Sequence, residues 1–294
     1  MKKILIFGSS GQVGWELSRS LASVGQIIAL DKMSADLTQP DKLRDVIYSI
    51  NPDIIINAAA YTAVDKAESE PDCAMLVNGI APGIMAEEAK RCGAIFVHYS
   101  TDYVFDGCSE RPYCEDDHAN PLNVYGKTKR AGEIAIQAVG GRYLIFRTSW
   151  VYGMRGRNFL LTMLKLAKEK EELKIVMDQH GAPTWSRTIA EATKDILCRD
   201  QASLENKWGI YNLTASGNTS WHGFAKAIFA LKQRLEGKDF RSPQLIGIPA
   251  SEFPSPAKRP QFSVLSHYKI REAFSVHLPN WETALEEAMS STNP

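Results

Sequence analysis

Short apolar runs alternate with amphipathic stretches along the first half of the chain. The runs lie at Ile4–Phe7, Ile27–Leu30, Asp53–Ala59, Ala94–Ser100 and Tyr143–Thr148, and each predicts a buried strand. Between them, apolar residues at helical spacing predict helices over Gln12–Val24, Pro40–Ile50, Pro71–Cys92 and Asn123–Val139. Strands that alternate with helices pair in parallel and are covered on both faces. The pattern therefore predicts an α/β fold with a doubly wound parallel sheet.

The alternation loosens after Trp150. Helical spacing continues over Asn158–Lys170, Thr188–Cys198 and Ser220–Leu235, and short apolar runs predict strands at Leu173–Met177 and Gly209–Leu213. Residues 249–260 hold four of the fourteen prolines, which predicts an irregular loop. We therefore expect one domain over residues 1–150 and a smaller one over residues 151–294. Part of residues 173–213 is expected to pack back on the first domain.

Composition narrows the class of protein. Apolar residues make up 44% and charged residues 23% of the 294 residues, as in ordinary globular proteins, and the formal net charge is zero. The charge pattern favours neither nucleic acid nor a membrane surface as a partner, and no apolar run has the length of a membrane-spanning helix. Five cysteines without metal-binding spacing predict free thiols and a cytoplasmic protein: Cys73, Cys92, Cys108, Cys114 and Cys198.

A glycine-rich turn separates the first predicted strand from the first predicted helix. Gly8, Gly11 and Gly14 recur at intervals of three, with Gln12 and Val13 between the last two. Glycine lets the backbone approach a pyrophosphate closely, and the helix N-terminus offers unpaired N–H groups. The alternative is a turn that only packs helix on strand. The strand–turn–helix context favours dinucleotide binding, hence a Rossmann-type first domain and a substrate-binding second domain, and the spacing favours the short-chain reductase type.

Further residues are candidate cofactor contacts. Asp31 ends the second strand, where a carboxylate bonds the adenosine ribose and disfavours a 2′-phosphate. Lys32 beside it weakens that preference, so we expect NADH or NADPH as the cofactor. Ligands bind beyond the carboxyl ends of parallel strands. We therefore expect two more stretches at the cofactor: Asp36 and Leu37 at the adenine, and Ala60, Tyr61 and Thr62 beside the diphosphate and ribose.

Tyr125 and Lys129 are candidate catalytic residues, because four residues of helix place them on one face. A nearby ammonium lowers the pKa of a phenol, which could then exchange a proton with a substrate oxygen. Thr101, at the end of the preceding strand, would hydrogen-bond the same oxygen, and Asp102 would bind a substrate hydroxyl. Each residue also has an alternative without a catalytic role. Tyr125 and Lys129 could be a chance pair on the surface, Thr101 could hydrogen-bond only to the backbone, and Asp102 could cap the next turn.

Five strings in the chain carry a family resemblance: INAAAYTAVDKAE at 56–68, VHYSTDYVFDG at 97–107, PLNVYGKTK at 121–129, FRTSWVY at 146–152 and DQHGAPT at 178–184. With them the chain resembles the dTDP-4-dehydrorhamnose reductases, a branch of the extended short-chain dehydrogenase/reductases. The match to the family is specific in the residues up to Trp185 and weaker in the residues after it. It implies hydride transfer from a nicotinamide cofactor to C4 of dTDP-4-dehydro-L-rhamnose, the last step of dTDP-L-rhamnose synthesis.

The resemblance also implies roles for single residues. Tyr125 becomes the proton donor, Lys129 its electrostatic and ribose-binding partner, and Thr101 the group that holds the carbonyl. Trp150 joins the substrate contacts, since an indole face packs on a sugar ring, although a core tryptophan is the alternative. The substrate contacts are then Thr101, Asp102 and Trp150, and the cofactor contacts are Gly11, Gln12, Val13, Asp31, Tyr99 and the turn Ala60–Thr62.

Other expectations concern a metal, the oligomer and the nucleotide. Some members of this family dimerise through a magnesium site built from glutamates, so a homodimer is an expectation for this chain. Glu16 matches one such position, but Arg187 stands where a glutamate is expected, which argues against magnesium. The nucleotide pocket must lie in the C-terminal third, where Lys258 and Arg259 are candidates to bind the diphosphate of a nucleotide sugar.

Two other functions stay open from the residues. One is a 4,6-dehydratase or 4-epimerase of nucleotide sugars, although a dehydratase needs an extra acid where Tyr103 follows Asp102. The other is a regulatory subunit of the methionine adenosyltransferase type, which resembles this branch and is not an enzyme. The intact pair of Tyr125 and Lys129 favours catalysis over regulation.

Overall fold

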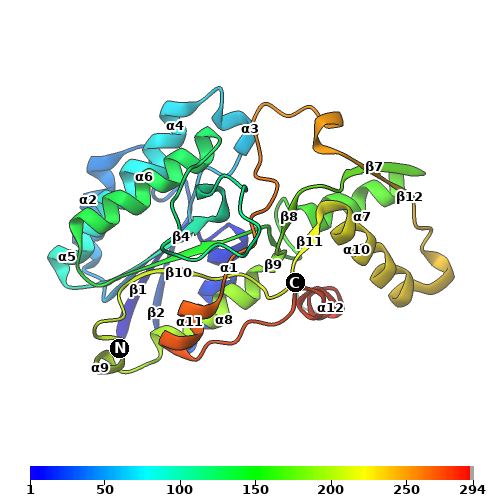
Figure 1. The fold of residues 1–294 in the computed structure, drawn as a ribbon. Coiled ribbons are helices and arrows are strands. Elements are labelled where there is room, and N and C mark those ends of the chain that lie inside the picture. Colours follow the sequence, from blue (N-terminus) through cyan, green and yellow to red (C-terminus); the bar gives the residue numbers. More distant parts are fainter. Residues whose placement is uncertain (292–294) are drawn as a thin grey trace.

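A six-stranded parallel sheet organises the larger lobe of the molecule (Figure 1). The computed structural model describes residues 1–291 of the chain. The strand order is β2–β1–β3–β4–β5–β10, and every neighbouring pair is parallel. This arrangement confirms the predicted α/β doubly wound fold. The strand bounds are Lys2–Phe7 (β1), Gly25–Leu30 (β2), Ile54–Asn57 (β3), Ile95–Thr101 (β4), Tyr143–Thr148 (β5) and Gly209–Asn212 (β10).

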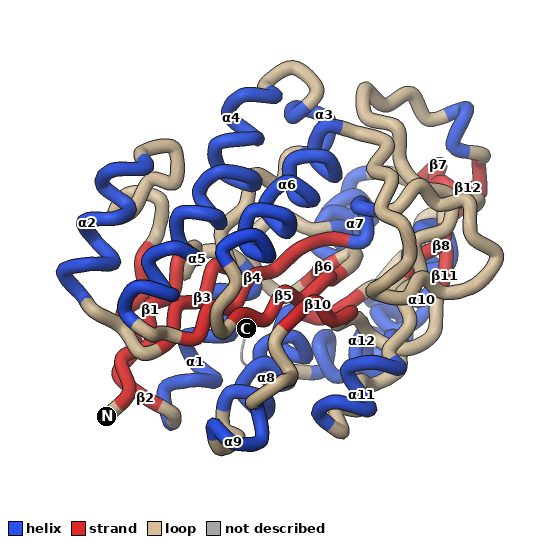
Figure 2. Tube along the Cα trace, turned by 60° about the vertical axis from the view of Figure 1, so that its left-hand side comes forward, coloured by secondary structure: helices blue, strands red, loops and turns tan. Residues whose placement is uncertain are grey.

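Helices cover both faces of this sheet (Figure 2). Ile55 and Phe96 pack with the helices on one face, whereas Ile56 and Val97 pack with those on the other. Successive strand residues point to opposite faces, so a sheet covered on both needs continuous apolar strands. The first face carries α2 (Pro40–Ile50), α5 (Ala81–Cys92) and α6 (Val124–Val139), and the second carries α1 (Gln12–Ser20), α8 (Ser186–Leu197) and α11 (Tyr268–Phe274).

The direction in which the sheet grows reverses between β1 and β3. Strand β2 lies on one side of β1, and all later strands of the sheet lie on the other side. The loops that leave the carboxyl ends of β1 and β3 diverge at this point and leave a crevice, which is where ligands bind in such sheets. The topology therefore predicts the position of the functional site.

The second half of the chain contributes to both lobes. Helix α8 packs along α1, and β10 extends the main sheet beside β5. A separate apolar cluster around Leu160, Phe224 and Trp281 forms the core of the smaller lobe. Around it lie α7 (Phe159–Glu169), α10 (Trp221–Glu236), α12 (Trp281–Ser290), and the paired strands β6 (Val151–Tyr152) with β9 (Thr184–Trp185), β7 (Glu172–Val176) with β12 (Gln244–Ile248), and β8 (His180–Gly181) with β11 (Thr219–Ser220).

Several short elements escaped the sequence patterns. Helices α11 and α12 were not predicted, nor were two single-turn helices, α3 (Val64–Ala67) and α9 (Gln201–Leu204). None of the helices within residues 1–291 has the length and hydropathy needed to span a bilayer. All five cysteines are free thiols, as expected from their spacing.

The predicted helix Pro71–Cys92 is not one regular helix. Helix α4 (Pro71–Met75) runs into a π-helical turn at Leu76–Ile80 before α5 begins. Pro82 has no N–H to donate to the carbonyl of Asn78, four residues earlier, so regular α-helical bonding is interrupted there. The Asn78 side chain accepts a hydrogen bond from the N–H of Tyr61 at 2.8 Å and donates to its carbonyl at 3.1 Å.

A buried ion pair fastens α6 to the sheet. Arg147 on β5 donates from Nε and Nη2 to the two carboxylate oxygens of Glu133, at 2.9 and 2.8 Å, and the two side chains are 2% and 0% exposed. Ser100 on β4 donates to the same carboxylate at 2.6 Å, and Arg130 donates at 2.7 Å. Although burial alone raises the pKa of Glu133, the hydrogen bonds and charge of Arg147 hold it below its ordinary value.

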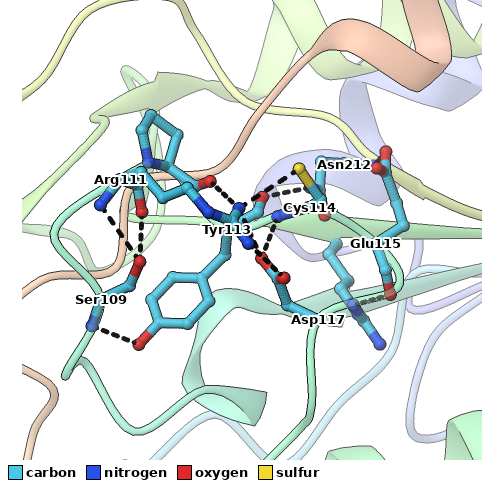
Figure 3. Close-up of polar contacts among 9 residues, drawn as sticks. Ser109, Arg111, Tyr113, Cys114, Glu115, Asp117 and Asn212 are labelled. Carbon is cyan, nitrogen blue, oxygen red and sulfur yellow. Dashed lines mark hydrogen bonds and ion pairs between the residues drawn. The ribbon is translucent and has the colours of Figure 1, made fainter.

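The long connection between β4 and α6 is also fixed by polar contacts (Figure 3). Glu115 accepts a hydrogen bond from the N–H of Asn212 at 2.8 Å, and the Asn212 amide donates to the carbonyl of Tyr113 at 2.9 Å. Arg147 donates from Nη1 to the carbonyl of Glu115 at 3.0 Å. The connection ends at Asn123, whose side chain caps the N–H of Gly126 at 2.8 Å, so the first turn of α6 has a fixed position.

We expect Arg147→Met to destabilise the fold by about 3–5 kcal/mol, because Glu133 then loses its main partner in a buried site. The measurement is the free energy of unfolding in urea, followed by tryptophan fluorescence. Arg44→Met is the matched control. Arg44 is 40% exposed, and Glu88, its buried partner, keeps an ion pair with Arg91, so the change should cost at most about 1 kcal/mol. An equal loss of unfolding free energy in the two variants would show that the buried ion pair contributes no more to stability than the exposed one.

Candidate active site

A cavity of about 830 Å³ opens where the main strands end at the reversal of the sheet. Most of the site residues expected from the sequence line it. Four do not: Gly14 and Glu16 are outside its lining, and Lys258 and Arg259 line a second cavity. Residues 8–151 supply most of the wall, and Gly156, Arg157 and Trp221 complete it. The expected residues that line it are Gly8, Gly11, Gln12, Val13, Asp31, Asp36, Leu37, Ala60, Tyr61, Thr62, Tyr99, Thr101, Asp102, Tyr125, Lys129 and Trp150.

The glycine-rich turn fits a dinucleotide diphosphate. Gly8 has a φ of +78°, which L side chains rarely adopt, and a Cβ on Gly14 would overlap the carbonyl oxygen of Gly8. Gly11 is the N-cap of α1, and no side chain caps the N–H groups of the first turn. These donors, together with the positive end of the helix dipole, form an anion site at the cavity wall.

Two aspartates at the cavity wall fix the turns that carry them. One Asp31 oxygen accepts both the N–H and the hydroxyl of Ser34, each at 2.9 Å, which lowers the pKa of Asp31. Asp36 accepts the N–H and hydroxyl of Thr38 in the same way, at 3.0 and 2.9 Å. Both hydrogen bonds from Ser34 go to Oδ1 of Asp31. Oδ2 of Asp31 can therefore accept a hydrogen bond from a ribose hydroxyl while Oδ1 fixes the turn at Ser34.

The Lys129 amine is held by groups on β4. Its Nζ donates to the carbonyl of Tyr99 at 2.5 Å and lies 3.2 Å from Nε2 of His98. The side chain is 1% exposed, and burial lowers the pKa of Lys129 to about 7. The Tyr99 hydroxyl bonds Thr193 on α8 at 2.7 Å, so Tyr99 contacts Lys129 through its main chain.

The pKa of Tyr125 differs from the expectation that Lys129 lowers it. Burial raises the pKa of Tyr125 to about 12, hydrogen bonding to Thr101 opposes the rise, and the charge of Asp102 adds to it. The expected lowering is wrong because the Lys129 amine is directed to β4. The Tyr125 phenol is therefore protonated near neutral pH, which suits a proton donor and not a base.

Asp102 is a buried carboxyl with spare bonding capacity. It is 2% exposed, its Oδ1 accepts from the Thr101 hydroxyl at 3.1 Å, and its buried Oδ2 accepts no well-formed hydrogen bond within residues 1–291. Burial raises the pKa of Asp102 to about 7, against the opposing effect of the Ser263 and Thr101 hydroxyls. The short turn after β4 is capped by Thr101, which accepts from the N–H of Tyr103 at 3.2 Å, and not by Asp102.

Two stacked tryptophans stand between the cavities of the two lobes. Trp150 and Trp221 have ring centroids 3.5 Å apart and planes 5° from parallel. Trp150 has a φ of +47°, a conformation that costs a bulky L residue about 1–3 kcal/mol and that clusters at ligand sites. Sequence analysis missed Trp221, because an aromatic residue at the start of an amphipathic helix looks like an ordinary core position.

A second cavity of about 980 Å³ adjoins the first and shares Trp221 with it. Its wall combines apolar side chains such as Phe159 and Phe253 with the cations Lys258 and Arg259. Arg259 is held by Asp65, at 2.8 Å between Nη2 and Oδ2, and this partner was not predicted. Beyond Lys258 and Arg259, the sequence of the C-terminal third contained no signal for this cavity, since its residues meet only on folding.

The surroundings of Glu16 do not fit a magnesium ion. Its carboxylate accepts from Nε of Arg187 at 3.2 Å, so a guanidinium takes the place of a cation. Nowhere within residues 1–291 do three or more His, Cys, Asp or Glu side chains gather closely enough to hold a metal ion.

Comparisons with known proteins agree on one family. The family model for the RmlD substrate binding domain matches residues 1–293. The chain is 50% identical over 287 residues to the dTDP-4-dehydrorhamnose reductase of Burkholderia thailandensis, covering 96% of each. Two similar solved structures are dTDP-4-dehydrorhamnose reductases, with 98% of each chain covered. That of Bacillus anthracis, in complex with NADP, has 34% identity and a TM-score of 0.90, and that of Clostridium acetobutylicum has 38% identity and a TM-score of 0.89.

We expect Gly14→Ala to lower the affinity for NADH and NADPH about tenfold or more, because the added methyl group must displace the Gly8 carbonyl that shapes the anion site. Fluorescence of the bound reduced nicotinamide measures this. Gly83→Ala is the matched control, since Gly83 is also buried in a helix but its new methyl group would meet only Ala135, away from the cavity. Unchanged cofactor affinity in Gly14→Ala would remove the turn from the cofactor site.

Proposed function

The chain belongs to the RmlD substrate binding domain family, and we propose that it reduces dTDP-4-dehydro-L-rhamnose to dTDP-L-rhamnose with NADH or NADPH. One observation carries the proposal. A protonated tyrosine, a threonine and a carboxyl with spare bonding capacity line the same cavity as a helix N-terminus that fits a dinucleotide diphosphate. We also propose a cytoplasmic location, consistent with five free thiols.

The reduction of a ketone adds a hydride to carbon and a proton to oxygen. A bound reduced nicotinamide supplies the hydride. Tyr125 supplies the proton, since its raised pKa keeps the phenol protonated until negative charge develops on the substrate oxygen. The Thr101 hydroxyl, which donates to Asp102, can turn to the same oxygen and hold it near Tyr125. Such donors stabilise a developing oxyanion.

The sugar ring has matching partners in the cavity. A buried acceptor without a hydrogen bond is costly, so a sugar hydroxyl that donates to Asp102 Oδ2 relieves that cost. Trp150 offers an apolar ring at the cavity wall, against which the carbon face of a sugar can pack. We assign the nucleotide to the second cavity, whose apolar wall suits a base and whose Lys258 and Arg259 suit a diphosphate.

The choice between NADH and NADPH rests on Asp31 and Lys32. Asp31 repels a 2′-phosphate, but one of its oxygens is already engaged by Ser34. Lys32 is exposed beside it and lines the cavity, so its ammonium can reach an added phosphate. We therefore propose that both cofactors are accepted.

The direct test is to mix the protein with dTDP-4-dehydro-L-rhamnose and each reduced cofactor, and to follow the loss of nicotinamide absorbance. A reductase consumes one cofactor for each sugar. A 4-epimerase or dehydratase recycles its cofactor and shows no net loss, and a regulatory subunit shows none either.

We expect Tyr125→Phe to lower kcat about 10²–10⁴-fold while cofactor affinity stays unchanged, because only the transferable proton is removed. Steady-state kinetics and a fluorescence titration of NADPH measure the two effects. Tyr152→Phe is the control, since Tyr152 is also buried and its hydroxyl accepts no hydrogen bond within residues 1–291. Near-normal turnover of Tyr125→Phe would assign the proton to another group.

We expect Lys258→Ala to raise the KM for the nucleotide sugar about fivefold, because one cation facing the diphosphate is lost, with no change in NADPH affinity. Lys168→Ala, on the exposed side of α7, is the matched control. An unchanged KM in Lys258→Ala would move the diphosphate away from this wall.

A further inference from the structure

A salt bridge joins an element of the first cavity to the segment that lines the second. Arg259 donates from Nη2 to Oδ2 of Asp65 at 2.8 Å, across 194 positions of the sequence. Arg259 lines the second cavity, whereas Val64 and Lys66, the neighbours of Asp65 in α3, line the first. Asp65 itself lines neither cavity, and the proposed reaction leaves it unused. Its carboxylate therefore reaches a group of one cavity from an element of the other.

The chain around Arg259 needs such a contact. Residues 255–259 form neither helix nor strand, so other elements have to fix their position. Oδ1 of Asp65 accepts from the Ser255 hydroxyl at 2.6 Å and from the N–H of Ala257 at 3.3 Å. Figure 1 shows this segment, in orange, beside α3. One carboxylate thus holds both the main chain of the segment and the Arg259 side chain.

Arg259 lies at the junction of the two cavities. Its Nη1 also donates to the Ser255 hydroxyl, and a hydrogen bond with Arg259 opposes the rise that burial causes in the pKa of Tyr103. Tyr103 lines the first cavity, and its ring meets the Tyr125 ring edge-on, with centroids 5.8 Å apart. The guanidinium therefore touches the side chain that packs against the proposed proton donor.

The diphosphate of a nucleotide sugar has to cross this junction, because it connects a sugar in the first cavity to a base in the second. The Arg259 side chain is 22% exposed, and a guanidinium presents a rigid fork of donors that matches a phosphate. Lys258 is exposed, and Asn123 holds its carbonyl, at 2.8 Å, rather than its amine. Of the two cations, Arg259 is therefore the one whose direction is set before a ligand binds.

We propose that Asp65 is a positioning residue, which holds the Arg259 guanidinium at the junction in the direction that the diphosphate requires. This role rests on the proposed function. It differs from a role through charge, and the two have opposite signs. Burial raises the pKa of Asp65, but hydrogen bonds from Arg259 and Ser255 hold it below its ordinary value, so the carboxylate is charged at neutral pH. A carboxylate repels a diphosphate, so Asp65 can favour binding only by orienting Arg259.

The first test needs no ligand. In nitrogen-labelled protein, a guanidinium held by a carboxylate rotates slowly and gives separate Nη–H signals, whereas a free guanidinium gives an averaged signal. The signals lost in Arg259→Lys assign Arg259. We expect separate Arg259 signals in the unmodified protein and an averaged signal in Asp65→Ala. Identical Arg259 signals in these two proteins would overturn the proposal, whether or not the protein reduces the sugar.

The second test measures the binding of dTDP, the nucleotide part of the proposed substrate, by calorimetry. We expect Asp65→Ala to weaken dTDP binding about tenfold, because Arg259 must then be ordered when the ligand binds, while NADPH affinity stays unchanged. Loss of a negative charge alone would strengthen dTDP binding. Equal or tighter binding of dTDP, or an equal loss for NADPH, would therefore overturn the proposal.

Failure of the proposed function gives a different result. An unmodified protein that binds no dTDP would overturn the proposed substrate, and the role of Asp65 with it. An unmodified protein that binds dTDP, together with an Asp65→Ala variant that binds it equally well, would overturn the role of Asp65 alone.

Asp117→Ala is the matched control. Asp117 accepts from Arg111 at 2.8 Å and from the N–H of Cys114 at 2.7 Å, and none of these three residues lines either of the two cavities. The variant removes the same charge and the same kinds of contact, so we expect its dTDP affinity to be unchanged. An equal loss of dTDP affinity in Asp117→Ala would overturn the proposal.

A double-mutant cycle tests whether Asp65 acts through Arg259. Arg259→Ala should weaken dTDP binding, and the addition of Asp65→Ala should cost nothing further, because no guanidinium is left to orient. A second loss of similar size would overturn the proposal. If Asp65→Ala does not fold, Asp65→Asn replaces it. An amide has one acceptor oxygen and cannot accept from both Ser255 and Arg259, so we expect a change in the same direction.

Discussion

The buried pair of Glu133 and Arg147 is the constraint on which the site geometry depends. A carboxylate removed from water has to be paired, and here two donors of one guanidinium meet both of its oxygens. Because Arg147 lies on β5 and Glu133 on α6, the helix cannot slide along the sheet without exposing both charges to an apolar interior. The same helix carries Tyr125 and Lys129, so their positions over β4 follow from an interaction that touches neither.

The arrangement of the two lobes divides the remaining tasks. The parallel sheet brings the ends of β1, β3, β4 and β5 to one edge, which explains why residues far apart in the sequence share a cavity. The smaller lobe adds a second cavity, and Trp221 stands at the junction in contact with Trp150. One end of the combined site is rich in backbone donors, the middle in hydroxyl and carboxyl groups, and the far end in apolar surface with two cations.

The sequence predicted the sheet and the glycine-rich turn well, because both rest on local patterns: continuous apolar runs, and glycines between a strand and a helix. Helical spacing correctly placed Tyr125 and Lys129 on one helix. It could not tell what the lysine amine would meet, and the tertiary contact with Tyr99 and His98 reversed the expected effect on the phenol. The π turn at 76–80, Trp221 and the Asp65–Arg259 pair depend on contacts between distant segments, which one sequence does not reveal.

The pairing of β3 with β4 has a consequence beyond cohesion of the sheet. Asn57 on β3 is paired with His98 on β4. Along β4, the side chains on either side of His98 point to the opposite face of the sheet. A slip of a single residue would bring Val97 or Tyr99 opposite Asn57, with a side chain on the wrong side and no nitrogen to contact. The main-chain register of β3 and β4 therefore also decides that a side-chain amide meets Nδ1 of the His98 imidazole.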